Sequence, residues 1–325
     1  MQRQGSTNIA LVVTVGSLAV VGLLIIGLMN LPDGSAAHNG SGEAASDNES
    51  KGGGSDETPA LEVYCAAGMK NPIEAAAEQF QAETGIEVQL QYGGSGTLLS
   101  NMQIARRGDL YIAADQSYID IAREKDLLDE AIPLARQRAV IAVRKGNPKN
   151  IRSIDDLLRE DVTFGLANPE AASVGKLTQN LLEQTGQWDE VKPAATVFKA
   201  TVNEIMAGVL IGSLDAAVIW NALVRQHPDE LEAVHVPAFD AAPQNVTIGV
   251  LRTCDQPARA LLFARYLQAP EKGERQFAQF GFETVAGDEW AQTPELTLFS
   301  GGVNRLAIRE TLEQFQQREG VEINT

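Results

Sequence analysis

The sequence predicts an α/β fold, because short apolar strands alternate with amphipathic helices along most of its length. Residues 61–65 have the character of a strand, residues 71–84 carry apolar side chains at helical spacing, and Gly85 stands where a helix C-cap belongs. This alternation is typical of parallel sheets, which bind ligands at the carboxyl ends of their strands. Further strands are predicted at residues 86–92, 110–113, 139–143, 162–166 and 216–220.

The N-terminal residues differ in kind from the rest. Residues 9–29 form an uncharged, largely apolar run preceded by Arg3, and about 20 such residues can span a bilayer. The basic flank predicts a cytoplasmic N-terminus and an exported remainder. We therefore predict a signal anchor, or transmembrane helix, at residues 1–29. A cleaved signal peptide is the alternative, with residues 35–37 as its cleavage site, although such apolar cores usually span only about 7–15 residues.

A linker is predicted to follow at residues 30–59. This segment is rich in Gly, Ser and acidic residues and offers almost nothing to bury. Chains of such composition behave as flexible tethers. The folded domain is therefore expected outside the cytoplasm, either held at the cell membrane by a single-pass anchor or free in the periplasm if the signal is cleaved.

The amino-acid composition argues against several classes of function. The 325 residues carry 26 Lys and Arg against 43 Asp and Glu, a formal net charge of −17. This balance argues against a nucleic-acid partner, which needs a concentrated basic face. Two cysteines and three histidines are few for metal or nucleophilic chemistry, so we predict no enzyme, no cofactor and no cation ligands. Whether Cys65 and Cys254 pair is left open.

Turns rich in small residues follow several of the predicted strands, at residues 66–68, 93–97 and 169–175. Small residues allow a ligand to approach the backbone, and the first N–H groups of the following helices are unsatisfied donors. Convergence of several such turns would create an anion site without a formal positive charge. The segments match neither a P-loop nor the dinucleotide fingerprint, which disfavours nucleotide binding.

Residues 92–98 (YGGSGTL) and 108–116 (GDLYIAADQ) resemble the signature of the periplasmic molybdate-binding proteins of ABC transporters, a type II periplasmic solute-binding family. The resemblance covers about residues 61–284. It implies a clamshell at residues 60–293, in which two α/β lobes are joined by two hinge strands. Lobe one is expected at about residues 61–134 and 240–290, and lobe two at about 135–239. Further matches lie at residues 168–170, Gly175, 186–188 and 280–282.

The resemblance also implies five oxyanion-binding residues: Gly68, Ser95, Val174, Val202 and Trp220. Ser95 matches directly, and Val174 and Val202 would supply backbone N–H groups. Gly68 replaces a serine and Trp220 replaces a tyrosine, so one hydroxyl is lost and the other becomes an indole N–H, which only donates. Donors alone suit a fully deprotonated dianion. Trp220 also has a simpler interpretation as a core residue at a strand end.

The resemblance implies an extracytoplasmic solute-binding protein that captures molybdate, or a similar tetrahedral oxyanion such as tungstate, for an ABC importer. The partners implied are the oxyanion, the ABC permease subunits and, through the anchor, the membrane. The alternative is a membrane-anchored oxyanion sensor or interaction module without a transport role.

An internal repeat links the two ends of the predicted folded region. When residues 61–88 are laid over 296–323, at a shift of 235, eight positions are identical, including the run Glu-Gln-Phe-Gln at residues 78–81 and 313–316. The repeat predicts that residues 294–325 are a partial second copy of the module's first βα unit.

Overall fold

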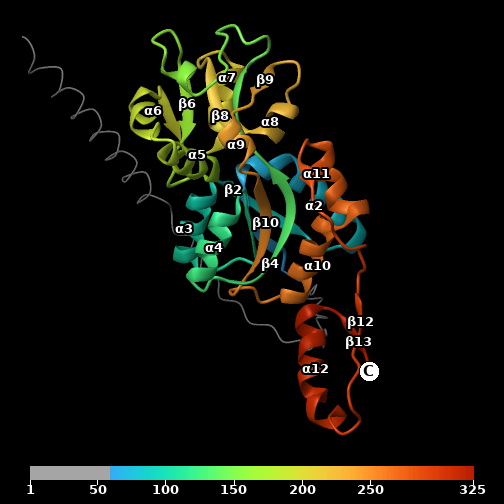
Figure 1. The fold of residues 1–325 in the computed structure, drawn as a ribbon. Helices are drawn as coiled ribbons and strands as arrows, with labels where there is room; N and C mark the ends of the chain where they lie inside the picture. The colour runs from blue at the N-terminus through green and yellow to red at the C-terminus, as the bar shows by residue number, and fades with distance from the viewer. Residues whose placement is uncertain (1–58) are drawn as a thin grey trace, which may run out of the picture. The chain divides into compact units, whose positions relative to one another are not determined.

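The computed structural model describes residues 59–325, which form two α/β lobes, each built on its own sheet, and a small C-terminal unit (Figure 1). The two-lobed α/β architecture predicted from the sequence is confirmed. Among the residues described, no helix has the length and apolar character needed to cross a bilayer. The predicted anchor at residues 1–29, and the linker up to residue 58, lie outside the described residues.

Lobe one contains a six-stranded sheet in the order β11-β4-β10-β3-β1-β2. β1 pairs in parallel with both β2 and β3, whereas β10 runs antiparallel to β3 and β4. The carboxyl ends of β1, β2 and β3 therefore meet at one edge of the sheet. The strands are β1 (Leu61–Ala66), β2 (Val88–Gly93), β3 (Leu110–Ala113), β4 (Leu128–Gln137), β10 (Gln244–Leu251) and β11 (Glu283–Thr284).

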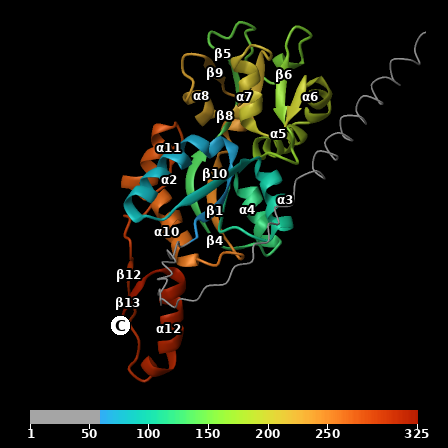
Figure 2. The ribbon, with the colours of Figure 1, turned by 180° about the vertical axis from the view of Figure 1, so that it is seen from behind.

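Helices cover both faces of this sheet (Figure 2). α2 (Lys70–Thr84), α10 (Pro257–Gln268) and α11 (Arg275–Gln279) share one apolar core with the sheet, in which the rings of Phe80 and Phe263 lie 4.9 Å apart. α3 (Ser95–Ala105) and α4 (Gln116–Glu124) form the second core, with Met102 and Tyr118 among its residues. Burial on both faces explains why β1 and β3 are almost continuously apolar.

Lobe two contains a five-stranded sheet in the order β7-β6-β8-β5-β9. β6 pairs in parallel with β7 and β8, and β5 runs antiparallel to β8 and β9. Its strands are β5 (Ala139–Arg144), β6 (Phe164–Ala167), β7 (Val197–Lys199), β8 (Ala216–Trp220) and β9 (Leu231–Val234). Its helices are α5 (Ser173–Gln184), α6 (Trp188–Ala194), α7 (Val202–Leu210), α8 (Asn221–Arg225) and α9 (Pro237–Asp240), with a 3-10 turn at Asp155–Leu158.

The chain crosses between the lobes twice. The first crossing is at Arg138, between β4 and β5. Asn221 Oδ1 accepts a hydrogen bond from the Arg138 backbone N–H at 2.9 Å, and the Asn221 backbone N–H donates to the Arg138 carbonyl at 2.8 Å. The second crossing leads from α9 into β10. Two crossings on neighbouring segments are the geometry of a hinge between lobes.

Two strands begin two residues later than predicted, at Val88 and Phe164. The physical reason is clear for β6. The backbone N–H and the hydroxyl of Thr163 both donate to the Asp215 carboxylate at 2.9 Å, so this residue is bound to a side chain before strand pairing begins.

The C-terminal unit consists of β12 (Glu295–Thr297), α12 (Arg305–Glu319) and β13 (Glu322–Asn324). The helix bounds and strand pairing of this unit repeat those of the first βαβ unit, which consists of β1, α2 and β2, at the shift of 235 residues. α12 has the shifted bounds of α2, and both helices end at a left-handed glycine, Gly85 (φ 73°) and Gly320 (φ 64°). The strand registers correspond as well, because Leu61 pairs with Val88 and Leu296 pairs with Ile323.

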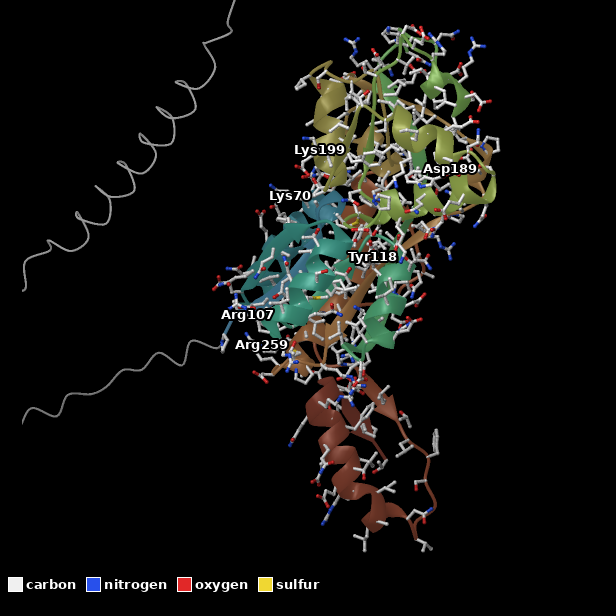
Figure 3. The ribbon with its side chains drawn as sticks, turned by 90° about the vertical axis from the view of Figure 1, so that its left-hand side faces the viewer. Lys70, Arg107, Tyr118, Asp189, Lys199 and Arg259 are labelled. Atoms are coloured by element: carbon white, nitrogen blue, oxygen red, sulfur yellow. The ribbon has the colours of Figure 1, made fainter. Side chains whose placement is uncertain are left out.

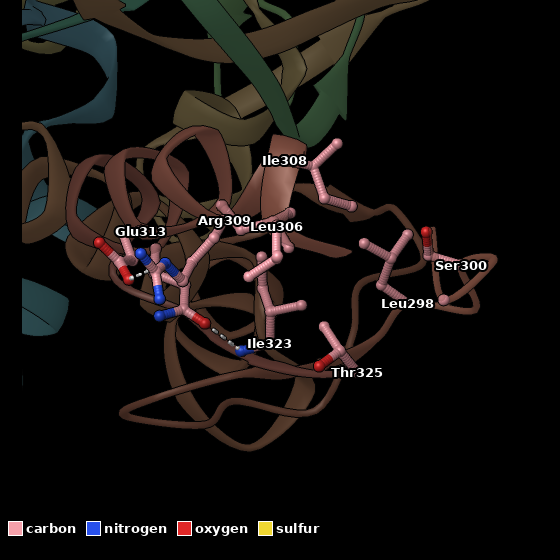
Figure 4. A pocket seen from close by; sticks show the side chains of 11 residues that line it. Leu298, Ser300, Leu306, Ile308, Arg309, Glu313, Ile323 and Thr325 are labelled. Carbon is pink, nitrogen blue, oxygen red and sulfur yellow. Dashed lines mark hydrogen bonds and ion pairs between the residues drawn. The ribbon is translucent and has the colours of Figure 1, made fainter. Parts of the chain in front are cut away.

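The C-terminal unit and the first βαβ unit (β1, α2 and β2) differ in how much of their surface is buried. The end of α12 is held on lobe one by an Arg318–Glu130 ion pair of 3.1 Å and by donation from Arg265 to the Glu319 carbonyl at 2.9 Å. Beyond this contact, a groove of about 520 Å³ lies open beside α12 (Figure 4). Phe299 is 93% exposed, whereas its counterpart Tyr64 is 2% exposed. The unit therefore has the local fold of the β1, α2 and β2 segment without the core that surrounds that segment.

Candidate oxyanion-binding site

A small cavity lies between the two lobes and brings all five predicted site residues together. The cavity volume is about 10 Å³, which corresponds to about one water molecule and is far below the size of a pocket for a drug-sized molecule. None of the lining residues carries a formal charge. They are Ala66, Ala67, Gly68, Gly93, Gly94, Ser95, Ala114, Ala172, Ser173, Val174, Val202 and Trp220.

Three helices begin at the cavity wall: α3 at Ser95, α5 at Ser173 and α7 at Val202. The first N–H groups of a helix have no acceptor within it, and the helix dipole adds partial positive charge at this end. The N-cap residues of α3 and α5 are Gly94 and Ala172, neither of which caps the helix with a side chain. On α3, the N–H groups of Gly96 and Thr97 are occupied by the Ala171 carbonyl of lobe two. The first N–H group of a helix that lacks a side-chain cap can donate to an anion.

The start of α7 is fixed by a capping box. Thr201 Oγ1 accepts the Glu204 N–H at 3.3 Å, and Glu204 Oε2 accepts the Thr201 N–H at 2.9 Å. This reciprocal pair satisfies two backbone donors without using the N–H of Val202. Val202 is therefore held at the cavity wall on a rigid helix start.

Ser95 is held by contacts on several sides and is 1% exposed. Its Oγ accepts the Ala114 N–H at 3.2 Å and the Ser173 hydroxyl at 2.8 Å. Its backbone carbonyl accepts the hydroxyl of Tyr111 at 2.8 Å. The predicted direct match to the family serine is thus a preorganised hydroxyl in the cavity wall.

Gly68 and Trp220, the two departures from the family pattern, are neighbours. A Cβ on residue 68 would lie 3.5 Å from Trp220 Cδ1 and 3.3 Å from Val202 Cγ1. Trp220 is 1% exposed and belongs to the main apolar core, yet it also lines the cavity. Packing and ligand contact are therefore compatible roles for this indole, which would be in ordinary van der Waals contact with a Cβ at position 68.

The lobes are closed on each other around the cavity. The N–H groups of Gly96 and Thr97 on α3 donate to the Ala171 carbonyl of lobe two at 2.9 and 3.3 Å. Asn203 Nδ2 donates to the Ala67 carbonyl at 3.2 Å. These contacts surround the site with polar bonds that exist only while the lobes are together.

A second group of closing contacts surrounds Tyr118 on α4, which is labelled in Figure 3. Its hydroxyl donates to the carbonyl of Pro169 at 3.3 Å, and Lys176 Nζ lies 4.9 Å from the centre of its ring. Burial, followed by the nearby Asp115 carboxylate, raises the pKa of Tyr118 to about 12. The phenol therefore remains a neutral donor to lobe two at physiological pH.

The cysteines do not form a reactive or cross-linked site. Cys65 and Cys254 are both free thiols. Burial raises the pKa of Cys65 well above its usual range, and burial with hydrogen bonding to Asp109 raises the pKa of Cys254 to about 12. A neutral thiol is a poor nucleophile. Within residues 59–325, no cluster of three or more His, Cys, Asp or Glu side chains is arranged to hold a metal ion.

Sequence reasoning missed Ser173, Gly94 and Ala114 as cavity residues. Ser173 and Gly94 lay inside the small-residue turns that the sequence singled out, next to Val174 and Ser95, which were predicted. Ala114 directly follows β3, so its position at a strand end was the available signal.

Comparison with known proteins agrees with this geometry. The family described as "Bacterial extracellular solute-binding protein" matches residues 61–283. A binding protein of Haemophilus influenzae is 28% identical over 68% of this chain and 90% of its own length. Molybdate-binding protein ModA of Escherichia coli is 26% identical over 68% of this chain and 88% of its own length.

Solved structures share the fold. The periplasmic molybdate-binding protein of Azotobacter vinelandii is 14% identical, with a TM-score of 0.59 over 70% of this chain and all of its own. A periplasmic thiamin binding protein is 16% identical, with a TM-score of 0.63 over 82% of this chain and 98% of its own. The resemblance to periplasmic molybdate-binding proteins predicted from the sequence is confirmed. This chain belongs to the bacterial extracellular solute-binding proteins.

Proposed function

We propose that this protein captures molybdate, or a similar tetrahedral oxyanion such as tungstate, outside the cytoplasm and delivers it to an ABC permease. The observation that carries the proposal is the small cavity between the lobes, whose lining is uncharged and into which three helix starts from two lobes converge. Relatives named as molybdate-binding proteins support the choice of ligand.

The mechanism follows from the donors. A deprotonated tetrahedral dianion has only acceptor oxygens, and the cavity offers the Ser95 hydroxyl, the Trp220 indole N–H and the backbone N–H groups of Gly68, Val174 and Val202. Gly68 and Ser95 belong to lobe one and the other three to lobe two. The complete donor set exists only in the closed state, so the anion stabilises closure by its preference for that state. Exclusion of water then strengthens each bond.

The chain's own residues supply binding and no chemical step in this proposal, so the protein acts as a carrier. The predicted N-terminal segment would hold the domain at the outer face of the membrane, close to the permease. Because the anion is bound by neutral donors, the net negative charge of the chain does not oppose its function.

The alternative function is an anchored oxyanion sensor. The C-terminal unit favours it, because Phe299 and Leu306 expose large apolar side chains outside the binding lobes, and exposed apolar patches mark interaction surfaces. A transport role predicts that a permease recognises the closed lobes. A sensor role predicts instead that a signalling partner recognises the C-terminal unit.

The proposed ligand is tested by calorimetric titration of the purified chain with molybdate, tungstate, sulfate and phosphate. We expect one molybdate or tungstate per chain, with weaker binding of sulfate and phosphate. Absence of binding by all four anions would show that the proposed function is wrong.

Replacing Ser95 by alanine is expected to weaken molybdate binding about 10- to 150-fold, because a hydrogen bond to a charged group contributes about 1.5–3 kcal/mol. The same titration measures the change. Ser100→Ala is the matched control, since Ser100 lies on the same helix and donates to the Gly96 carbonyl at 3.1 Å. Equal affinities for Ser95→Ala and the unmodified chain would remove Ser95 from the site.

A further inference from the structure

The segment that leads from β12 into α12 exposes three large apolar side chains on the C-terminal unit. Phe299 is 93% exposed, Val303 is 95% exposed and Leu306 is 80% exposed. We call these three residues the apolar tip. The Asn304 N–H donates to the Gly301 carbonyl at 2.9 Å, so a turn lies within this segment. Exposed apolar side chains gathered in one segment mark a surface for another molecule.

The missing core of the C-terminal unit does not account for the apolar tip. At the shift of 235 residues, Val303 corresponds to Gly68, which has no side chain. Leu306 corresponds to Asn71, which is polar and exposed in lobe one. The first copy therefore offers no apolar side chain at two of the three positions, and the tip is a feature of the C-terminal unit itself.

The charge beside the apolar tip differs from that of the whole chain. Residues 298–309 contain two arginines and no Asp or Glu, whereas the full chain has a net charge of −17. The first copy has Glu74 at the position of Arg309, so an acidic residue there corresponds to a basic one here. The Arg309 side chain is 72% exposed, and its Nε lies 3.9 Å from a carboxylate oxygen of Glu313. Apolar and basic residues side by side are complementary to a lipid surface, which is apolar within and anionic at its face.

The predicted linker reaches the folded part of the chain beside the base of the C-terminal unit. The Pro59 carbonyl accepts a hydrogen bond from Arg259 Nη1, near the start of α10, at 3.1 Å. Next to it, a Cβ on Gly320 at the end of α12 would lie 3.2 Å from Ala258 Cβ. The first turn of α12 is about 20 Å from Gly320 along the helix, and a linker of this length and composition spans about 30 Å root-mean-square. The apolar tip is therefore within reach of a membrane that holds the predicted anchor.

We propose that the apolar tip inserts into the surface of the lipid bilayer and holds the C-terminal unit against it. The inference rests on the part of the proposed function that places the domain at the outer face of the membrane. The three apolar side chains leave water for the boundary between headgroups and acyl chains, and Arg309 faces the headgroup phosphates. The anchor and the tip then form two points of attachment, which restrict how the domain turns relative to the bilayer.

Phe299→Trp tests the proposal in the full chain, reconstituted into vesicles of phosphatidylcholine and phosphatidylglycerol with brominated acyl chains. Bromine quenches an indole that it touches, and the substitution keeps a large apolar ring in the tip. We expect the emission of the introduced indole to fall about twofold or more relative to vesicles without bromine, because the ring lies at the acyl boundary. The unmodified chain, which has three tryptophans, gives the background to subtract.

Ile211→Trp is the matched control, since Ile211 is 79% exposed and ends α7 in lobe two. Its introduced indole should keep its emission in brominated vesicles. Adding Val303→Ser and Leu306→Ser to Phe299→Trp should abolish the quenching. Adding Ile104→Ser instead, which removes an exposed apolar side chain from α3, should leave the quenching unchanged. Calorimetric titration of each variant with molybdate shows whether the lobes are intact.

The outcomes separate this inference from the proposed function. A full chain that does not float with the vesicles in a density gradient would overturn the proposed anchoring and this inference together. A chain that floats and binds molybdate, but shows no quenching in Phe299→Trp, would overturn this inference alone. Equal quenching in Ile211→Trp would also overturn it. A blue-shifted emission of Phe299→Trp that appears only at high protein density, without quenching by bromine, would overturn it in favour of a second copy of this chain as the partner.

Discussion

Gly94→Ala is expected to weaken molybdate binding at least about 100-fold while leaving each lobe folded. Gly94 has an extended backbone (φ −70°, ψ 144°) that any residue can adopt. A Cβ at this position would lie 2.3 Å from the Ala171 carbonyl oxygen and 2.5 Å from that of Ala200. Both atoms are backbone atoms of lobe two, so they cannot move aside as a side chain could. The added methyl group therefore blocks closure.

The size of the effect follows from the donors that closure supplies. In the proposed site, the N–H groups of Val174 and Val202 on lobe two would reach an anion held on lobe one only when the lobes meet. Loss of two hydrogen bonds to a charged ligand, each worth about 1.5–3 kcal/mol, exceeds a factor of about 100 in affinity. Calorimetric titration with molybdate measures the loss, and circular dichroism with thermal unfolding verifies the fold.

Gly301→Ala is the matched control for Gly94→Ala, because a Cβ on Gly301 would have no atom within 4 Å. Its molybdate affinity should equal that of the unmodified chain. If Gly94→Ala bound molybdate within about threefold of the unmodified chain, the closed contact between the lobes would not be required for binding.

The five predicted site residues line one cavity because each lies at or just after a strand end, or at a helix start. Ser95 and Val202 begin helices, Val174 is the second residue of α5, and Trp220 ends β8. Strand ends of one sheet meet at one edge, so local pattern and topology together bring such residues into one place. The family resemblance then predicted which residue of each turn would face the ligand, and that assignment stays a prediction.

Contacts between the lobes could not be predicted in this way. The pairing of Ser173 with Ser95, and the close approach of Gly94 to Ala171, join residues about 80 positions apart and depend on the exact angle of closure. Small residues in a turn are equally compatible with simple helix capping. Only the assembled lobes show which of them touch.

The C-terminal repeat shows the opposite case, in which local pattern determines local fold. Residues 295–324 reproduce the helix bounds, the left-handed glycine and the strand register of the first βαβ unit, although Phe299 and Leu306 remain largely exposed. The correspondence supports the interpretation of this unit as a partial second copy. Its spacing therefore persists in the absence of the core that buries the first copy.

Gly68 and Trp220 are expected to be strongly coupled, which a double-mutant cycle would show. Gly68→Ser alone should weaken molybdate binding about 30-fold or more. The new Cβ would lie 3.3 Å from Val202 Cγ1 and 3.5 Å from Trp220 Cδ1, and the hydroxyl would extend into a cavity with very little free space. Overpacking of a rigid site typically costs about 1–3 kcal/mol, to which the displaced ligand contacts add.

Trp220→Tyr alone should also weaken binding, because a smaller ring leaves a void where the indole is now buried. The double variant Gly68→Ser with Trp220→Tyr restores the serine and tyrosine of the family pattern, and the smaller ring makes room for the serine hydroxyl. We expect its molybdate affinity to return to within about threefold of the unmodified chain, a coupling of about 2–3 kcal/mol between the two positions.

The cycle also separates the two interpretations of Trp220. If the indole served only to pack the core, Trp220→Tyr would lower the free energy of unfolding, measured by denaturant titration, without changing molybdate affinity. The effects of the two substitutions on binding would then simply add. Strong coupling in binding would instead mean that the loss of a hydroxyl at Gly68 and the gain of an indole at Trp220 are one change in the cavity, since each is tolerated only because the other is present.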